Sequence, residues 1–214
     1  MKKVVSFFAV AAALLIAGSA QAQLGINVGY APETTTSVLT IGNTSTKSTD
    51  VMNGFFAGVN YNINVSGDLN FSVGLQARYN TNSSEDKVST VTTKTNRTKI
   101  MADIPLLFNY GIRVGNDARL SVFLGPTVSY ALQGKITTTV SESITGANTV
   151  KSSSMYGENS NNSPLDIMGT AGLSFNFKGF RLYAGYRMGF MDLNKSDNVK
   201  TTAAGWFAGA GFVL

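Results

Sequence analysis

The residue types that most often carry out catalysis are scarce in this chain. Its 214 residues include no histidine and no cysteine, which excludes Ser-His-Asp triads, histidine metal sites and thiol chemistry. Aspartate and glutamate occur, but no two of them lie at a spacing that would form a catalytic carboxylate pair on one inward face. We therefore expect no catalytic residue, no metal site and no cofactor, and we predict that the protein is not an enzyme.

Four charged residues form the best remaining candidate for a site: Arg78, Asp103, Arg113 and Arg187. Each lies on the polar side of a stretch in which large apolar residues alternate with small or polar ones. Arg78 and Asp103 lie at similar distances from their neighbouring turns, so we expect them at similar depth. They could line a narrow ion-selective path, or they could form an ion-pair network that fills a lumen. A small packed interior favours the network.

Alternation of apolar and polar residues runs through most of the chain and is typical of β-strands with two different faces. Within 55–65, Gly58 and three asparagines share one face, and the other face carries Phe55, Ala57, Val59, Tyr61, Ile63 and Val65. A short turn at 66–68 would pair Val65 with Leu69. The same alternation recurs in seven further segments: 23–38, 69–79, 100–114, 120–132, 167–177, 180–190 and 204–214. The sequence therefore predicts eight strands.

The connections between these strands alternate in length. Short turns are expected at 66–68, 116–118 and 178–179. Longer loops rich in Thr, Ser and Asn are expected at 39–51, 80–98, 133–164 and 192–203. Such alternation places the short turns at one end of a barrel and the long loops at the other, as in outer-membrane barrels. Pro105 and Pro126 fall inside predicted strands, where we expect a bulge or kink at each.

The two faces distinguish a membrane barrel from a soluble one. The polar face is dense in Gly, Asn, Ser and Thr and weakly charged, unlike a solvated surface, and small side chains suit the interior of an eight-stranded barrel. The apolar face carries aromatic residues toward both strand ends, as interfacial girdles do. They are Tyr61, Phe71, Phe177, Phe180 and Phe212 at the turn end, and Tyr30, Tyr79, Tyr130, Phe190 and Trp206 at the loop end. The predicted fold is all-β: an eight-stranded antiparallel transmembrane up-and-down β-barrel, OmpA/OmpX-like.

Residues 1–22 have the organisation of a secretion signal. Lys2 and Lys3 precede an apolar stretch at 4–17, and Ala20-Gln21-Ala22 fits the small-x-small cleavage pattern. The apolar stretch is shorter than the roughly 20 residues that a membrane-spanning helix needs. We expect cleavage between Ala22 and Gln23, with 23–214 forming a single barrel domain.

Three strand motifs resemble a known family. Residues 103–108 (Asp-Ile-Pro-Leu-Leu-Phe) resemble its E-I-P-L-L-L strand, 123–130 resemble its G-P-x-V-S-Y strand, and 183–189 resemble its R-Y-x-x-G-L strand. The family is the Bacteroidota outer-membrane β-barrel family that includes the PorT-type proteins. The resemblance implies an outer-membrane protein, with one branch linked to type IX secretion. The chain departs from the family in having Asp103 where Glu is usual and in ending at Leu214 instead of an aromatic residue.

Together these patterns predict a non-enzymatic integral protein of the outer membrane that presents extracellular loops for envelope structure or surface binding. We expect a monomer with periplasmic termini, surrounded by outer-membrane lipids, with envelope or secretion proteins as further partners. The net charge of +5, two of it from the predicted leader, is too small to indicate nucleic-acid binding. The alternatives are a PorT-like component of protein secretion, a narrow small-solute channel and a soluble lipocalin-like binder.

Overall fold

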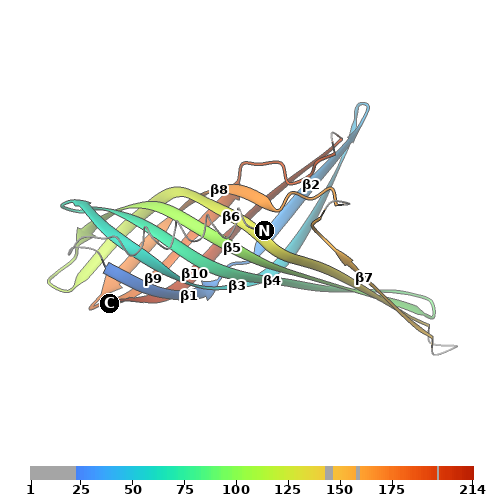
Figure 1. Cartoon of the computed structure of the whole chain (residues 1–214), viewed down its shortest axis with the longest axis horizontal. Coiled ribbons are helices and arrows are strands. Elements are labelled where there is room, and N and C mark those ends of the chain that lie inside the picture. The colour runs from blue at the N-terminus through green and yellow to red at the C-terminus, as the bar shows by residue number, and fades with distance from the viewer. Residues whose placement is uncertain (1–22, 143–146, 158–159, 197) are drawn as a thin grey trace.

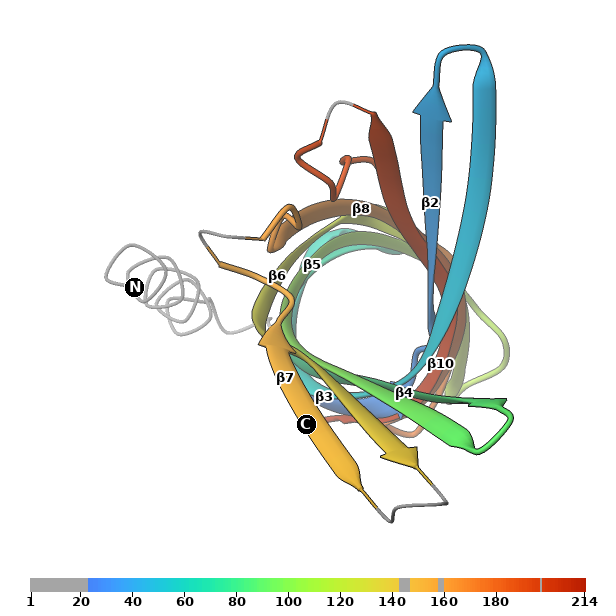
Figure 2. The same ribbon diagram turned by 90° about the vertical axis from the view of Figure 1, so that its right-hand side faces the viewer.

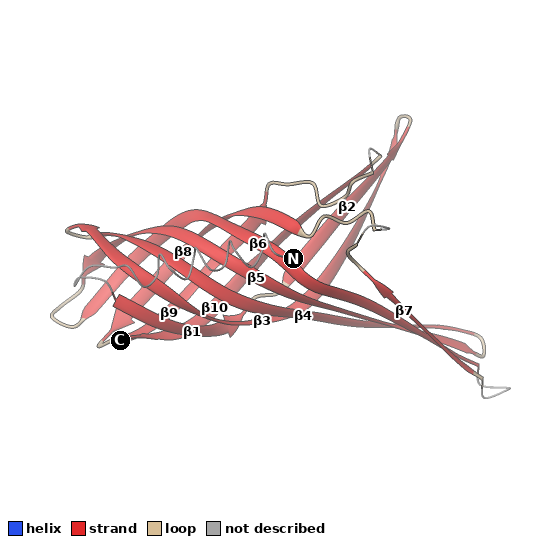
Figure 3. Cartoon of the chain, viewed as in Figure 1, coloured by secondary structure: helices blue, strands red, loops and turns tan. Residues whose placement is uncertain are grey.

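The computed structural model describes residues 23–142, 147–157, 160–196 and 198–214 (Figure 1). The predicted leader 1–22 and the Ala22 side of its cleavage site lie outside the described residues. All regular elements of the described residues are strands (Figure 3). No helix in this part of the chain is long and apolar enough to cross a membrane.

Ten strands form one antiparallel sheet that closes on itself (Figure 2). They are β1 (Gln23–Tyr30), β2 (Glu33–Ile41), β3 (Thr44–Ser66), β4 (Leu69–Val88), β5 (Val91–Arg113), β6 (Ala118–Glu142), β7 (Asn148–Ser154), β8 (Leu165–Phe177), β9 (Phe180–Gly189) and β10 (Val199–Val213). β1 and β2 both lie between β3 and β10, so they make up one interrupted wall strand. β7 pairs only with β6, outside the ring. The predicted eight-stranded up-and-down barrel is confirmed.

The outer face of the barrel is apolar. Val28, Phe55, Leu124 and Leu173 are each more than half exposed, and burying such side chains is favourable by about 25 cal/mol per Å² of apolar area. Near the loop end, the Tyr30 ring lies 5.3 Å from the rings of both Phe55 and Trp206. This polarity suits lipid outside and polar packing inside, and it argues against a soluble lipocalin-like barrel.

The register between β3 and β4 is as predicted along most of its length, with Ile63 opposite Phe71. The predicted pairing of Val65 with Leu69 is wrong, because Ser66 pairs with Leu69 and Val65 lies in a bulge. The turn therefore has two residues, and Gly67 adopts a φ of 52°, which glycine tolerates readily.

The two strand prolines interrupt the pairing without shifting it. Between β5 and β6 the pairs run to Pro105–Thr127 and resume at Phe108–Leu124 in the same register. The register shift in this strand pair lies at Ile100/Met101 instead. The prolines thus interrupt the ladder, as expected. Of the predicted bulge or kink, no bulge occurs at either proline, because the register is unchanged across them.

The predicted long loops are in large part strands, which corrects the expectation for 39–51, 80–98 and 133–164. β2 and β3 turn at residues 42–43, β4 and β5 turn at 89–90, and β6 continues to Glu142. Threonine favours strands, and each of these segments has a neighbouring strand to pair with. Among the described residues, the segment between β7 and β8 and the segment before Val199, within the predicted 192–203 loop, are mostly irregular.

Gly172 of β8 lies where a side chain would collide with its neighbours. A Cβ there would be 2.3 Å from the Ala184 carbonyl oxygen and 2.4 Å from Cζ of the buried Phe123. We expect Gly172→Val to lower the free energy of unfolding by roughly 2 kcal/mol, because overpacking forces the ring or the backbone to move. Urea unfolding of the refolded barrel measures this loss. Ala171→Val, on the exposed outer face, is the control, and equal losses in both variants would contradict the explanation.

Candidate functional site

A charged cluster spans the lumen toward the loop end of the barrel. Arg78 of β4 uses all three of its guanidinium nitrogens. Nε and Nη2 donate to Asp103 at 2.8 and 3.3 Å, and Nη1 donates to Glu33 at 2.7 Å. Arg187 of β9 donates from Nη1 to Asp103 at 3.1 Å, and Lys99 of β5 donates to Glu33. The cluster therefore connects β2, β4, β5 and β9 across the barrel.

The cluster is almost fully removed from solvent. Arg78 is 1% exposed, Asp103 0% and Glu33 2%. Charges this deeply buried are tolerated only when they are paired and hydrogen-bonded. Three cations face two carboxylates, and both carboxylates are held by two cations each. We call these five residues, Glu33, Arg78, Lys99, Asp103 and Arg187, the lumen cluster.

The structure brings together three of the four charged residues singled out from the sequence. Arg78, Asp103 and Arg187 are in contact, whereas Arg113 is not part of the lumen cluster. Arg113 is the last residue of β5 and is exposed at the turn end, opposite Arg119 of β6. Its strand face is the one predicted, but it lies at the other end of the barrel from Asp103.

Sequence reasoning missed Glu33 and Lys99. Glu33 lies near the loop end of the first predicted strand, and Lys99 borders the predicted loop 80–98, so neither position indicates the lumen. The Thr- and Asn-rich stretch before Lys99 proves to be part of β5. The strand propensity of threonine was the signal that could have extended the strand and included Lys99.

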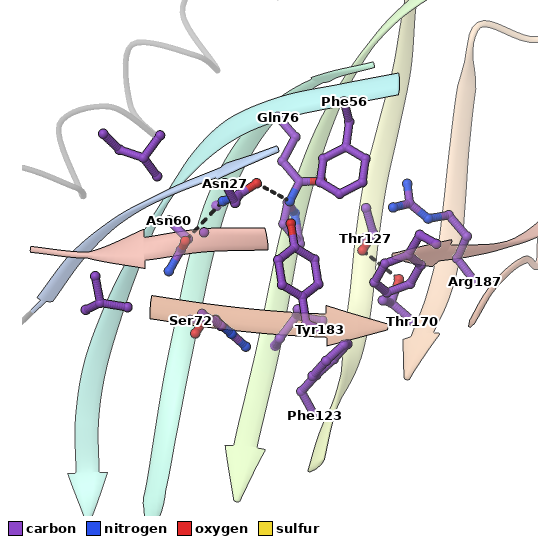
Figure 4. Close-up of a pocket in the computed structure, with 18 of the residues that line it drawn as sticks. Asn27, Phe56, Asn60, Ser72, Gln76, Phe123, Thr127, Thr170, Tyr183 and Arg187 are labelled. Atoms are coloured by element: carbon purple, nitrogen blue, oxygen red, sulfur yellow. Dashed lines mark hydrogen bonds between the residues drawn. The ribbon is translucent and has the colours of Figure 1, made fainter. Parts of the chain in front are cut away.

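An aromatic layer fills the middle of the lumen next to the lumen cluster. Phe56, Phe123 and Phe207 are each 3–4% exposed, and Tyr183 packs against them. Their ring centroids are 6.1–6.3 Å apart. The Arg187 guanidinium lies 4.8 Å from the centroid of the Phe207 ring, which joins this layer to the lumen cluster. Figure 4 shows Phe56, Phe123 and Tyr183 from different strands turned into one interior space.

Three cavities follow one another along the lumen. The middle one, of about 60 Å³, is bordered by Phe56, Phe123, Phe207 and Arg187. A loop-end cavity of about 320 Å³ reaches inward to Lys99, and a turn-end cavity of about 380 Å³ reaches inward to Arg181. The lumen cluster and the aromatic layer therefore divide the interior into two vestibules with a small space between them.

Polar side chains hold the walls of the middle cavity in place. Asn27 donates to Asn60 at 3.1 Å and accepts from Gln76 at 3.3 Å, and Thr127 shares a 2.8 Å hydrogen bond with Thr170 (Figure 4). At the loop-end cavity, burial raises the pKa of Tyr156, which lies after β7. Its hydroxyl therefore keeps its proton at neutral pH.

This arrangement is suited to holding strands together, since its acids already serve as partners of cations. In the described segments, no group of three or more Asp and Glu side chains gathers where it could hold a metal ion. Cross-strand ion pairs at this depth fix the register of four wall strands and occupy the space that a path for solutes would need.

Solved structures with a similar course of the chain include the attachment invasion locus protein Ail of Yersinia pestis, in complex with the heparin analogue sucrose octasulfate. The two sequences are 20% identical, the match covers 91% of this chain and 99% of that one, and the TM-score is 0.41. Neisserial surface protein A is 16% identical over 87% and 96%, with a TM-score of 0.33. The outer membrane enzyme PagL is 10% identical over 83% and 97%, with a TM-score of 0.39.

Among curated proteins, none matches the sequence. The family described as "Outer membrane protein beta-barrel domain" matches residues 18–195, which is most of the chain. The barrel closure, the apolar outer face and the polar lumen agree with this match. The chain therefore belongs to the outer membrane protein beta-barrel domain family and is an integral protein of the outer membrane.

Proposed function

We propose that the protein is a non-enzymatic surface-binding scaffold, in which a closed barrel holds two β-structured projections away from the membrane. The observation that carries this proposal is the length of the strands. β3, β4, β5 and β6 have 23, 20, 23 and 25 residues, whereas roughly 10 residues cross the apolar part of an outer membrane. About half of each strand therefore extends beyond the lipid at the loop end.

The extensions form two separate blades. The first blade is the β2–β3 hairpin beyond the buried Glu33 and Met52, residues 34–51, and the second blade is the outer part of β4, β5 and β6 together with β7. β3 pairs with β4 only as far as Asn53–Thr81, so in the described part of the chain no strand pairing joins the two blades beyond that point. Side-chain contacts of Asn82 and Arg97 with Asp50 link them only at their base. Figure 2 shows them diverging from the ring. Paired strands hold a fixed shape, which lowers the entropy cost of binding relative to flexible loops.

The tips of the blades combine polar faces with a few exposed aliphatic residues. Ile41 of the first blade is 69% exposed, and Val88 and Val150 of the second blade are 74% and 63% exposed. The flanking positions are mostly Thr, Ser and Lys. Apolar contacts surrounded by a polar rim are common at protein interfaces.

Shortening the second blade tests the proposal. Replacing residues 84–95 with Asn-Gly would join Ser83 to Asn96, which are partners in the β4–β5 pairing, through a turn that suits two antiparallel strands. We expect the shortened protein to insert and to migrate as a heat-modifiable band. We also expect cells that display it to lose the attachment to protein- and glycan-coated surfaces that the full chain confers.

A deletion strain complemented with either form separates binding from an envelope role. If the shortened barrel restores detergent resistance but not attachment, the blades act in binding. If the full chain confers no attachment above the vector control, the surface-binding proposal is wrong and the envelope role remains.

A role as a PorT-like component of protein secretion is the second proposal. It is supported by the resemblance of the segments 103–108 and 123–130, which lie side by side in β5 and β6 around the prolines. A barrel with a filled lumen would act there as a partner of the machine instead of a conduit for cargo. Deleting the gene and measuring the secreted cargo tests this role, and unchanged secretion would exclude it.

A further inference from the structure

The turn-end cavity has a wall rich in amide groups and arginine. It has a volume of about 380 Å³ and opens where the short turns lie. Five asparagines from β3, β4, β5 and β8 contribute to it, together with Arg119 and Arg181, and its lining contains no Asp or Glu side chain. The amide and hydroxyl side chains around this cavity can both donate and accept hydrogen bonds, and its charged side chains, Arg119 and Arg181, are cations that only donate.

Three arginines lie in one row across neighbouring strands at this end. Arg113 pairs with Arg119, Arg119 pairs with Asn176, and Asn176 pairs with Arg181. Like charges on directly opposed positions of adjacent strands destabilise a sheet. A row of three cations with no acid in it is therefore costly unless an anion or solvent offsets the charge.

The two arginines at the cavity wall are only partly satisfied. Arg181 donates from Nη2 to Asn109 at 3.2 Å and to Ser174 at 3.4 Å, both of them neutral, and its other contacts are the rings of Phe123 and Tyr183. Arg119 donates from Nη2 to the carbonyl oxygens of Asp68 and Gly111, and it lies 3.6 Å from the half-exposed Asp68 carboxylate.

The Nε atoms of both arginines are buried and have no acceptor among the described residues. Arg181, in particular, has no carboxylate partner within the described part of the chain. A buried guanidinium without a carboxylate partner is unfavourable, so a bound anion would stabilise this region.

We propose that the turn-end cavity, with Arg119 and Arg181 in its wall, binds a small free oxyanion such as inorganic phosphate or sulfate. Arginine presents a planar set of N–H donors that matches the oxygens of such ions. The amide N–H groups of Asn64, Asn70 and Asn176, which also line the cavity, are further neutral donors. Arg181 lies against the rings of Phe123 and Tyr183, so the aromatic layer is on the inner side of the cavity. An ion would enter from the turn end, which faces the periplasm in barrels of this kind.

The test uses the full mature barrel, refolded in a non-ionic detergent and free of phospholipid, so that no lipid phosphate can occupy the site. Inorganic phosphate is titrated calorimetrically against a buffer of matched ionic strength, with chloride titrated in parallel. We expect saturable one-to-one binding of phosphate and at least about tenfold weaker binding of chloride, which offers one centre instead of several oxygens. The Nε–Hε resonances of Arg119 and Arg181 should shift on phosphate addition.

Variants locate the site. Arg181→Gln and Arg119→Gln are each expected to weaken phosphate binding about tenfold. Lys178→Gln removes the same charge at the same end of the barrel, but its side chain is exposed outside the cavity, and it should change the affinity less than twofold. Absence of saturable phosphate binding by the wild type, equal affinity for chloride, or equal losses in all three variants would each overturn the proposal. If a variant fails to fold, the arginine resonances of the wild type still decide, because unshifted resonances at saturating phosphate would also overturn it.

Discussion

Replacing Asp103 with asparagine is expected to destabilise the barrel by about 3–5 kcal/mol, the typical cost of breaking a buried ion pair from one side. Asp103 is fully buried and accepts hydrogen bonds from both Arg78 and Arg187. An asparagine of the same size would keep the volume but leave three cations facing one carboxylate. Its amide group would also point a donor at a guanidinium. The loss should appear as a lower urea midpoint of the barrel refolded in lipid.

The matched control for Asp103→Asn is Asp50→Asn. Asp50 also pairs with an arginine, Arg97, at 2.5 Å, but both side chains are more than a third exposed. Exposed pairs contribute about 0–1 kcal/mol, so the same chemical change should have little effect there. Equal losses at both positions would show that burial in the lumen cluster does not determine the stability of the barrel.

The barrel itself could be predicted from the sequence because its two signals are local. Alternation places residues such as Phe55 and Phe56 on opposite faces, and short turns such as Lys178–Gly179 define the pairing next to them. The outer ends of the strands could not be predicted in the same way. Threonine-rich segments such as 91–98 suit both a loop and a strand, and pairing with a neighbouring strand decides between them.

The lumen was only partly predictable. Arg78 and Asp103 follow from strand register, since both lie on the inward face at the same depth. Glu33 joins them from β2, after the break at Ala31–Pro32, and no local pattern relates its position to Arg78. The inward position of three aromatic rings could have been predicted from the alternation of strand faces alone. Phe56, Phe123 and Phe207 occupy the same face as the glycines and asparagines, and their alternation could have indicated a second filled layer.

The second large effect concerns the lumen as a barrier to ions. We expect the wild-type barrel to show no steady openings in planar bilayers, because the lumen cluster and the aromatic layer lie in series. An eight-stranded barrel is just wide enough for its side chains to fill it. For barriers in series, removing one leaves the other in control, so a variant that lacks only one layer should also stay closed.

The charge-neutral pair Arg78→Ser with Asp103→Ser thins the lumen cluster, and Phe56→Ala with Phe207→Ala thins the aromatic layer. Only the combination of all four changes is expected to conduct, with a current at least about tenfold above the background of either pair alone. Heat-modifiable migration on gels verifies that each variant is folded. Phe55→Ala with Trp206→Ala is the control for the loss of aromatic rings. These two residues directly precede Phe56 and Phe207 in the sequence, but they are more than half exposed on the outer face.

The pattern across the variants decides between a filled lumen and the narrow-channel alternative. Steady openings of the wild type would favour the channel and contradict the closed scaffold, because ions would then pass both layers as they stand. If the variant with all four substitutions folds but carries no current, other side chains close the barrel. Conductance after one pair alone would identify that layer as the single barrier, with the other too loosely packed to stop ions.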